Sequence, residues 1–210
     1  MAYKETEARE LIISAVHRLT EAGLVARTWG NVSARISEEQ FVITPSGLGY
    51  EHMQPEDLVL VNISDLSYEG ERKPSSEKGH PCGCLPAEAG GNFVIHTHQD
   101  KASVYGIRGW ALSGFSDPVL GKRVPCAAYG LPSTDKLRQA VADQLSSNPS
   151  AQAILMRGHG ALCLGTDCDT AFQAAEALER ICAERIGAVL DEELKMYTEQ
   201  RALWPMPDYG

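Results

Sequence analysis

The sequence predicts a protein of the α/β class, in which strands and helices share one core. Its 210 residues are enough for one such domain, since domains commonly hold about 100–200 residues, and we expect the whole range 1–210 to form it. Short β-like runs alternate with longer runs of helical periodicity along the chain. Hydrophobic residues make up 43% and charged residues 22% of the chain, which is ordinary for a globular protein and excludes a disordered or fibrous one.

The N-terminal part predicts a helix followed by three strands. Apolar residues recur at helical spacing from about Thr6 until Gly23 ends the pattern. VSARI at 32–36 and FVITP at 41–45 are short β-like runs separated by a polar stretch, which predicts a hairpin. LVLVNI at 58–63 then extends the sheet.

The middle of the chain begins with an irregular stretch. Residues 64–92 are dense in Gly, Pro and Ser, and an irregular stretch of that size inside a compact domain is usually functional. NFVIHTH at 92–98 predicts a strand, and QDKASVYGI at 99–107 predicts a helix. An irregular segment then reaches about Arg123, before a strand over VPCAAY at 124–129.

The C-terminal part predicts two helices on either side of a strand pair. The first helix runs from Ser133 to about Leu145, and the strand AILM follows at 153–156. RGHGALCLG at 157–165 is typical of a tight turn between strands. A long helix is expected from Thr166 to about Arg201, with a possible break at Gly187.

Charge and composition exclude several classes of partner. The formal net charge is -9 and the pI is near 5.1, so the chain lacks the basic surplus that binding to nucleic acid or to an anionic membrane requires. No stretch approaches the roughly 18 apolar residues of a membrane span, and no secretory signal opens the chain. We therefore expect a cytoplasmic protein whose six cysteines are reduced thiols.

Two histidines stand at the end of an apolar run. His96 and His98 are separated by one residue, and strand geometry sends such residues to the same face. The pair is therefore suited to bind a metal ion. A solvated histidine beside one satisfied in the core is the alternative, because an isolated H-x-H pair is a weak signal.

A third histidine strengthens the metal hypothesis. His159 lies between two glycines that permit a sharp turn and direct the ring into a cleft, although a plain turn histidine has the same surroundings. Three imidazoles with one open position are typical of a catalytic Zn²⁺ site, and Mn²⁺ or Co²⁺ also fit because ligand type discriminates poorly between them. A rival cluster at His80, Cys82 and Cys84 lacks the spacing of zinc knuckles.

A carboxylate and three small turns complete the candidate set. Glu77 is able to ligate a metal or act as general base near one, or else to be a solvated acid in a capping turn. The turns carry small residues whose N–H and hydroxyl groups suit a phosphate dianion, although each alone is simply a turn. Their residues are Gly30, Asn31, Ser46, Gly47, Ser75 and Ser76.

Taken in order, these motifs resemble the class II aldolase/adducin family, the group of L-fuculose-phosphate aldolase. The resemblance spans most of the chain, and VPCAAYG at 124–130 also resembles a family segment. The motifs that carry it are GNVS at 30–33, ITPSG at 43–47, PSSE at 74–77, HTH at 96–98 and GHG at 158–160.

The resemblance implies a fold and a site. It implies a three-layer α/β/α domain on a mixed, largely antiparallel sheet, and a homotetramer with active sites at subunit interfaces. It also implies a zinc ion on His96, His98 and His159, with Glu77 as the acid/base that also touches the metal. The turns at 30–31, 46–47 and 75–76 would bind the phosphate of a small phosphorylated sugar.

The implied reaction is retro-aldol cleavage of a ketose 1-phosphate, such as fuculose 1-phosphate, to dihydroxyacetone phosphate and an aldehyde. The metal would stabilise the enediolate, and Glu77 would move the proton at C3. The alternatives on the same scaffold are an epimerase, a dehydratase or a decarboxylase, and an adducin-like module without catalysis. Glu rather than Asp at position 77 disfavours the epimerase.

Two features depart from the family pattern. The segment after Glu77 contains Pro81, Pro86 and several glycines, where relatives continue into a helix. The tyrosine that relatives supply from a neighbouring subunit to protonate the aldehyde is absent near Gly114 and Phe115. Candidate replacements are Tyr129, Tyr197 and Tyr209.

Overall fold

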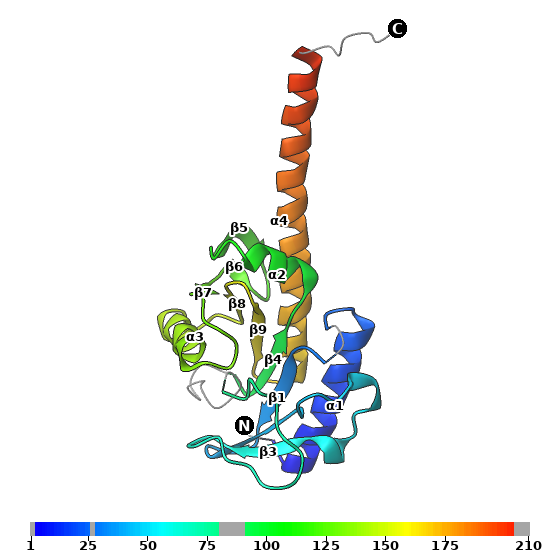
Figure 1. The fold of residues 1–210 in the computed structure, drawn as a ribbon, viewed down its shortest axis with the longest axis vertical. Helices are drawn as coiled ribbons and strands as arrows, with labels where there is room; N and C mark the ends of the chain where they lie inside the picture. Colours follow the sequence, from blue (N-terminus) through cyan, green and yellow to red (C-terminus); the bar gives the residue numbers. More distant parts are fainter. Residues whose placement is uncertain (1–2, 26–27, 80–90, 204–210) are drawn as a thin grey trace.

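The computed structural model describes residues 3–25, 28–79 and 91–203, with side chains up to residue 196. Figure 1 shows a globular body from which one long helix projects. The helices are α1 (Glu5–Glu21), α2 (Asp100–Gly106), α3 (Asp135–Ser147) and α4 (Cys168–Leu203). The strands are β1 (Asn31–Arg35), β2 (Gln40–Ile43), β3 (Val59–Asn62), β4 (Phe93–Thr97), β5 (Leu112–Asp117), β6 (Gly121–Val124), β7 (Cys126–Ala127), β8 (Ala153–Met156) and β9 (Gly160–Gly165).

Seven strands form the central sheet in the order β3-β2-β1-β4-β9-β8-β7. Every neighbouring pair is antiparallel except β7 and β8, which are parallel. The mixed, largely antiparallel sheet is therefore confirmed. The strand that carries the histidine pair, β4, lies in the middle of the sheet, between β1 and β9.

Helices cover both faces of this sheet. Along β4, Phe93 and Ile95 join the apolar cluster under α1, α2 and α4, while Val94 joins the cluster under α3. This alternation is what a strand buried on both faces requires. The predicted three-layer α/β/α arrangement is confirmed, and His96 shares the α3 face with Val94 because the two residues are two positions apart.

The sequence placed most elements correctly and missed one hairpin. The segment expected to be irregular up to Arg123 contains β5 and β6, which pair with each other outside the main sheet. Most residues of this hairpin are exposed, so it lacks the apolar alternation by which strands are predicted. The expected strand at 124–129 shrinks to Cys126–Ala127, and the break expected at Gly187 is wrong, because α4 continues through it.

Two further expectations concern the whole chain. In the parts that the structure describes, no helix is both long and apolar enough to cross a membrane. The described cysteines, Cys126, Cys163, Cys168 and Cys182, are free thiols, as expected. The rival metal cluster at 80–84 and the segment with Pro81 and Pro86 lie outside the described residues.

Two glycines permit a close approach of neighbouring chain segments to the end of β4. A Cβ atom on Gly30 would collide with the backbone carbonyl of His96, and one on Gly160 would collide with that of Thr97. Gly30 also has a φ of 99°, which other residues rarely adopt. The backbone around the histidine pair is therefore packed more tightly than any side chain at these two positions would allow.

We predict that Gly160→Ala lowers the free energy of unfolding by about 1–3 kcal/mol, because the added methyl group must displace the β4 backbone. Urea denaturation measures this change. Gly49→Ala is the matched control, since nothing lies within 4 Å of a Cβ at Gly49. Equal effects of the two substitutions would show that the close approach is unimportant.

Candidate metal centre and active site

His96 is fixed by the sheet. Its side chain is fully buried, and the ring Nδ1–H donates to the carbonyl oxygen of Ala161 on β9, at 2.9 Å. A carbonyl only accepts hydrogen bonds, so this contact sets the tautomer and leaves Nε2 as the nitrogen that faces the site. The orientation of the ring is thus set by the pairing of β4 with β9.

Two other histidines converge on the same point. The Nε2 atom of His98 lies 3.1 Å from that of His96, and the three ring centroids are 4.8 to 5.0 Å apart. His159 comes from the turn between β8 and β9, where Gly158 adopts a φ of 65°. Three residues from two neighbouring strand ends therefore present imidazole nitrogens to one small volume.

Glu77 closes this group from the irregular segment before residue 80. Its carboxylate oxygens lie 2.9 Å from Nε2 of His96 and 3.0 Å from Nε2 of His159. One ligand atom from each of Glu77, His96, His98 and His159 lies within 4.8 Å of all the others. Glu77 therefore contacts two of the three histidines and lies within reach of the third.

The electrostatics of the group favour metal-binding protonation states. Burial acts to raise the pKa of Glu77, but hydrogen bonds from His159 and His96 outweigh it and lower that pKa well below its usual range. Burial, with the neighbouring His96 and His159, lowers the pKa of His98 to about 4. Glu77 is therefore anionic and His98 neutral near pH 7, which are the forms that coordinate a cation.

Three nitrogens and one carboxylate are a donor set that fits a divalent transition metal. Zn²⁺ in catalytic sites commonly takes three protein ligands of this kind and keeps a position open. The Nδ1 atom of His96 is already occupied by a carbonyl, as expected of a metal-ligating histidine. The four residues of this cluster, called the metal cluster below, are Glu77, His96, His98 and His159.

Two of the predicted phosphate turns are joined by backbone hydrogen bonds. The amide of Ser46 donates to the Lys73 carbonyl at 2.9 Å, and that of Ser75 donates to the Thr44 carbonyl at 3.1 Å. The Ser75 hydroxyl in turn accepts from the Glu77 amide at 3.3 Å. The TPSG and SSE motifs, about 30 residues apart in sequence, therefore form one wall beside the metal cluster.

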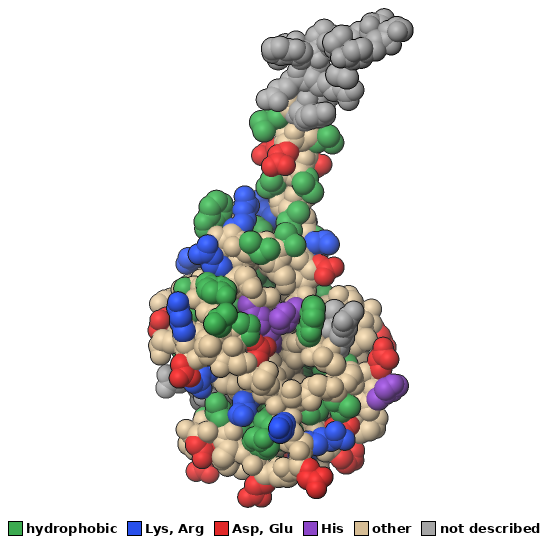
Figure 2. Space-filling model, in the orientation of Figure 1, with side chains coloured by type: hydrophobic (Ala, Val, Ile, Leu, Met, Phe, Trp, Pro, Cys, Tyr) green, Lys and Arg blue, Asp and Glu red, His purple; other side chains and the backbone are tan. Residues whose placement is uncertain are grey.

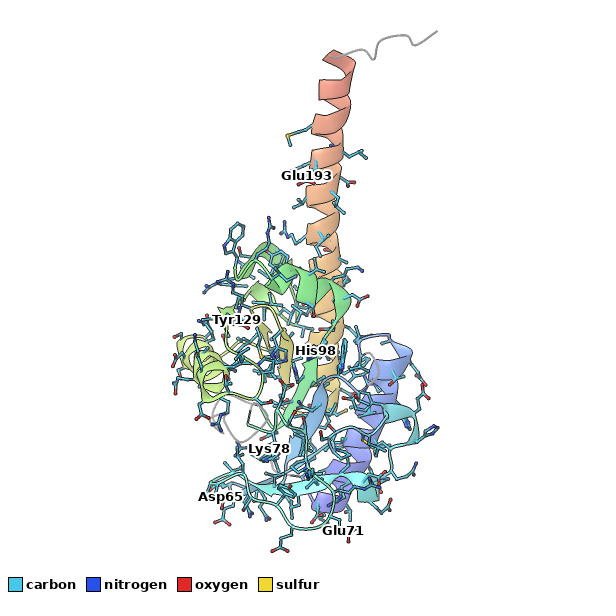
Figure 3. All side chains as sticks on the ribbon, viewed as in Figure 1. Asp65, Glu71, Lys78, His98, Tyr129 and Glu193 are labelled. Carbon is cyan, nitrogen blue, oxygen red and sulfur yellow. The ribbon has the colours of Figure 1, made fainter. Side chains whose placement is uncertain are left out.

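This wall and the metal cluster share a pocket of about 390 Å³. Figure 2 shows histidine side chains in a hollow near the middle of one face, and Figure 3 shows His98 close to the centre of the body. Five of the six predicted phosphate residues line the pocket. The lining residues are Thr28, Trp29, Gly30, Pro45, Ser46, Gly47, Ser75, Ser76, Glu77, His98, Pro132, Ser133 and His159.

Asn31 is the predicted residue that does not line the pocket. It is fully buried on β1 opposite His96, and its side-chain amide has no hydrogen-bond partner among the described residues. A buried amide without a partner is unusual in a native structure. Asn31 thus lies one strand away from the metal cluster with unused hydrogen-bonding capacity.

Five lining residues were not among the candidates from the sequence, and one of them, Pro45, lies within the TPSG motif. Thr28 and Trp29 precede the GN motif, and the Trp29 ring lies 6.1 Å from that of His98, measured between centroids. Pro132 and Ser133 come from the loop before α3, where Ser133 has a φ of 62°. Strained residues of this kind concentrate at functional sites, but no sequence signal distinguishes a left-handed serine.

One of the three tyrosine candidates, Tyr129, has a described side chain, and it does not line the pocket. Tyr129 is 48% exposed and is absent from the pocket lining, although its ring would lie 3.7 Å from a Cβ atom on Gly158, the residue before His159. Phe115, near the position where the family tyrosine was expected, packs against the larger apolar cluster. The side chains of Tyr197 and Tyr209 lie outside the described residues.

Comparison with known sequences identifies the family. Residues 10–186 match the model of the Class II Aldolase and Adducin N-terminal domain. The chain is also 33% identical, over 179 residues, to 5-deoxy-D-ribulose 1-phosphate aldolase of Bacillus thuringiensis serovar kurstaki, a match that covers 84% of this chain and 82% of the relative.

Comparison with solved structures supports the same family as the sequence comparison. An L-fuculose 1-phosphate aldolase superposes with a TM-score of 0.74 at 25% identity, covering 95% of this chain and 97% of that one. The L-fuculose-1-phosphate aldolase of Thermus thermophilus gives a TM-score of 0.68 at 25% identity, covering 89% and 94%. The chain therefore belongs to the class II aldolase and adducin family and is one of its enzymes, a lyase.

Proposed function

We propose that this lyase is a zinc-dependent aldolase that cleaves a ketose 1-phosphate to dihydroxyacetone phosphate and an aldehyde. The observation that carries the proposal is the convergence of Glu77 with three histidines beside a pocket lined by small hydrogen-bond donors. An adducin-like module without catalysis is disfavoured, because the complete metal cluster would then have no use.

His96, His98 and His159 would hold the metal, and Glu77 would contact it or the substrate. Zn²⁺ is the proposed ion, with Mn²⁺ or Co²⁺ as substitutes, and it would supply Lewis-acid stabilisation of the negative charge that develops on the ketose oxygens. The lowered pKa of Glu77 keeps its carboxylate deprotonated, which is the form that a general base requires. In the synthetic direction Glu77 takes the proton from C3 of dihydroxyacetone phosphate, and in cleavage it returns it.

The phosphate of the substrate would lie against the wall made by the two serine turns. Among the described residues that line the pocket, none is Lys or Arg, so the dianion would be held by hydroxyl and backbone N–H groups. Gly30, Ser46, Gly47, Ser75 and Ser76 line this side, and we include the buried amide of Asn31 because its hydrogen-bonding capacity is unused.

The proton donor for the aldehyde is proposed to come from another subunit. Among the described residues that line the pocket, none is a tyrosine, yet C3–C4 cleavage requires a group that takes the proton from the C4 hydroxyl as the aldehyde forms, and that returns it to the aldehyde oxygen in the synthetic direction. We therefore propose a homotetramer in which neighbouring subunits complete each active site. The cytoplasmic location stays a prediction from the sequence.

The substrate panel that tests this proposal contains fuculose 1-phosphate, 5-deoxyribulose 1-phosphate and ribulose 1-phosphate. The first two are named by the relatives of this chain. Dihydroxyacetone phosphate is followed by a coupled NADH assay with zinc-loaded protein, and NMR identifies all products. Release of dihydroxyacetone phosphate is expected. An epimer, a dehydrated sugar or carbon dioxide as the product would replace the aldolase by the corresponding alternative.

We predict that His159→Ala abolishes metal retention, because it removes one of three nitrogen ligands. Metal content of dialysed protein is measured by mass spectrometry, and near one ion per chain is expected for the wild type. His17→Ala, an exposed histidine on α1, is the matched control. Full metal content in the His159 variant would exclude this cluster as the metal centre.

We predict that Glu77→Gln lowers kcat by about 10²–10⁴-fold, the usual contribution of general acid–base catalysis. Exchange of the C3 proton of dihydroxyacetone phosphate with deuterated water should fall in parallel, since that exchange needs only the base. Glu71→Gln serves as the control for loss of an exposed acid. Undiminished exchange in the Glu77 variant would assign the base elsewhere.

We predict that Ser76→Ala raises KM for the phosphorylated substrate about tenfold and leaves kcat nearly unchanged, because one hydrogen bond to a charged group is lost. Ser113→Ala, on the exposed face of β5, is the control. Steady-state kinetics provide the measurement. A fall in kcat with constant KM would place Ser76 in the chemical step instead of the phosphate site.

A further inference from the structure

The pocket beside the metal cluster has walls that the phosphate and the metal do not account for. The two serine turns, Gly30 and the metal cluster leave two loops in its lining. Thr28 and Trp29 precede β1, while Pro132 and Ser133 precede α3. In a ketose 1-phosphate the carbons beyond C3 lie on the side of C2 and C3 away from the phosphate. These two loops are therefore the walls available to the aldehyde half of the substrate.

Trp29 is the largest side chain of these walls, and its place is fixed by the residue that follows it. Gly30 packs so closely against the carbonyl of His96 that a Cβ atom would collide with it. The Trp29 ring lies beside that of His98, with the centroids 6.1 Å apart and the ring planes tilted by 49°. Figure 2 shows apolar side chains on both sides of the hollow that holds the histidines. The indole is thus held at the edge of the metal cluster.

Trp29 is not part of the core that stabilises the fold. It belongs to neither of the two apolar clusters and is 57% exposed. Tryptophan carries one of the largest apolar surfaces of any residue and is highly buried on average. The indole therefore has an apolar face that stays in contact with water until a ligand enters the pocket.

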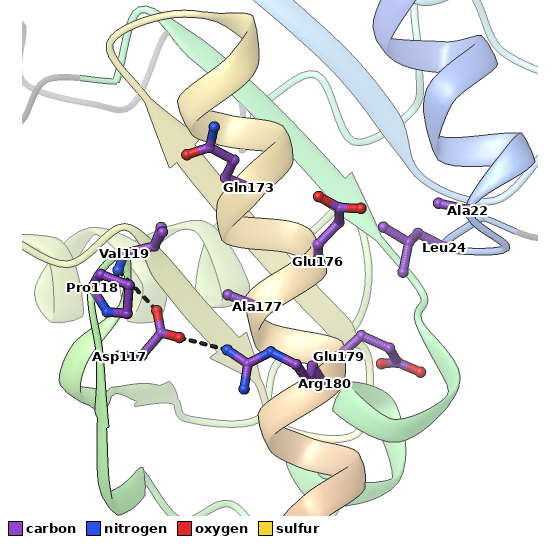
Figure 4. A pocket seen from close by; sticks show the side chains of 10 residues that line it. All are labelled: Ala22, Leu24, Asp117, Pro118, Val119, Gln173, Glu176, Ala177, Glu179 and Arg180. Carbon is purple, nitrogen blue, oxygen red and sulfur yellow. Dashed lines mark hydrogen bonds and ion pairs between the residues drawn. The ribbon is translucent and has the colours of Figure 1, made fainter.

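A larger hollow beside α4 is different, because charged groups in it already have partners. It measures about 590 Å³ and lies where the end of α1, the turn after β5 and α4 meet. Arg180 pairs with Asp117 at 2.5 Å, as Figure 4 shows, and Glu179 accepts hydrogen bonds from the backbone at the start of α2. Groups paired in this way gain little from a ligand. The indole of Trp29, in contrast, leaves contact with water only when a ligand covers it.

An indole face favours a carbon that carries only hydrogen. A methyl group that covers the ring removes apolar surface from water, whereas a hydroxyl group turned against the ring gives up hydrogen bonds to water and gains none. The C4 hydroxyl of the ketose can use the hydroxyls of Thr28 and Ser133, which leaves the last carbon to Trp29 and Pro132. Among the described residues of the lining none is Lys or Arg, so a second phosphate at that carbon would have no cationic partner.

We propose that Trp29 is a specificity-determining residue, whose indole covers the last carbon of the aldehyde half and selects substrates that end in a methyl group. The proposal rests on the proposed function, because it takes the serine turns and the metal cluster as the site of the other half. Ribulose 1-phosphate and 5-deoxyribulose 1-phosphate form a matched pair for it, since they differ only by a hydroxyl group on C5. An apolar wall discriminates against one added hydroxyl by up to about 100-fold.

The first test measures binding without turnover. Dissociation constants of both sugars are measured by calorimetry in zinc-loaded Glu77→Gln protein, and NMR verifies that the sugars remain intact. 5-Deoxyribulose 1-phosphate should bind about tenfold more tightly than ribulose 1-phosphate. Adding Trp29→Ala should nearly abolish this difference, whereas Trp29→Phe should keep most of it. Trp110→Ala is the matched control, because Trp110 is similarly exposed and does not line the pocket.

Three results of this test would overturn the role of Trp29. They are equal binding of the two sugars, a difference in binding that Trp29→Ala leaves unchanged, and the absence of binding by both sugars. Circular dichroism checks that each variant remains folded, which is expected because Trp29 lies outside both apolar clusters.

Turnover separates this proposal from the proposed function. In protein that retains Glu77, Trp29→Ala should lower kcat/KM for 5-deoxyribulose 1-phosphate about tenfold and leave that for ribulose 1-phosphate nearly unchanged. Exchange of the C3 proton of dihydroxyacetone phosphate should not change, since no aldehyde takes part in it. Selective binding without release of dihydroxyacetone phosphate would refute the aldolase and retain the role of Trp29. Cleavage of both sugars with equal kcat/KM would retain the aldolase and overturn that role.

Discussion

The close approach of two neighbouring segments to the end of β4 is the constraint on which the site depends. Gly30 and Gly160 leave no room for a side chain against the carbonyls of His96 and Thr97. Because of this approach, β1 and β9 pack tightly on both sides of the histidine pair, and the turn before β9 brings His159 to within reach of it. The metal cluster is therefore a property of the central sheet, and only Glu77 enters it from an irregular segment.

The sequence predicted most of what the sheet determines. The long helices and the buried strands were recognisable because their apolar residues must face one core. That requirement gives the apolar residues a regular spacing along the sequence. The H-x-H pair and the glycines around His159 indicated a metal site for a geometric reason. A strand end or a glycine turn leaves few directions in which a side chain can point. The placement of Glu77 next to them rested on the order of motifs, not on spacing.

What could not be predicted depends on contacts between distant segments. The β5–β6 hairpin is largely exposed and has no apolar alternation, so the local sequence pattern does not predict its two strands. Trp29 and Ser133 line the pocket only because the loop before α3 meets the segment before β1 across the metal cluster. The register pairs Asn31 directly with His96, so the two side chains leave the sheet on the same face, and a shift of one residue would reverse the direction of Asn31.

The irregular origin of Glu77 has a consequence for turnover. The three histidines are attached to strand ends that the sheet immobilises, whereas Glu77 belongs to an irregular segment outside the sheet. The four residues therefore divide into three that the sheet positions and one that it does not. In the proposed reaction, the anionic carboxylate of Glu77 would serve as the base while the three imidazoles keep their positions at the strand ends.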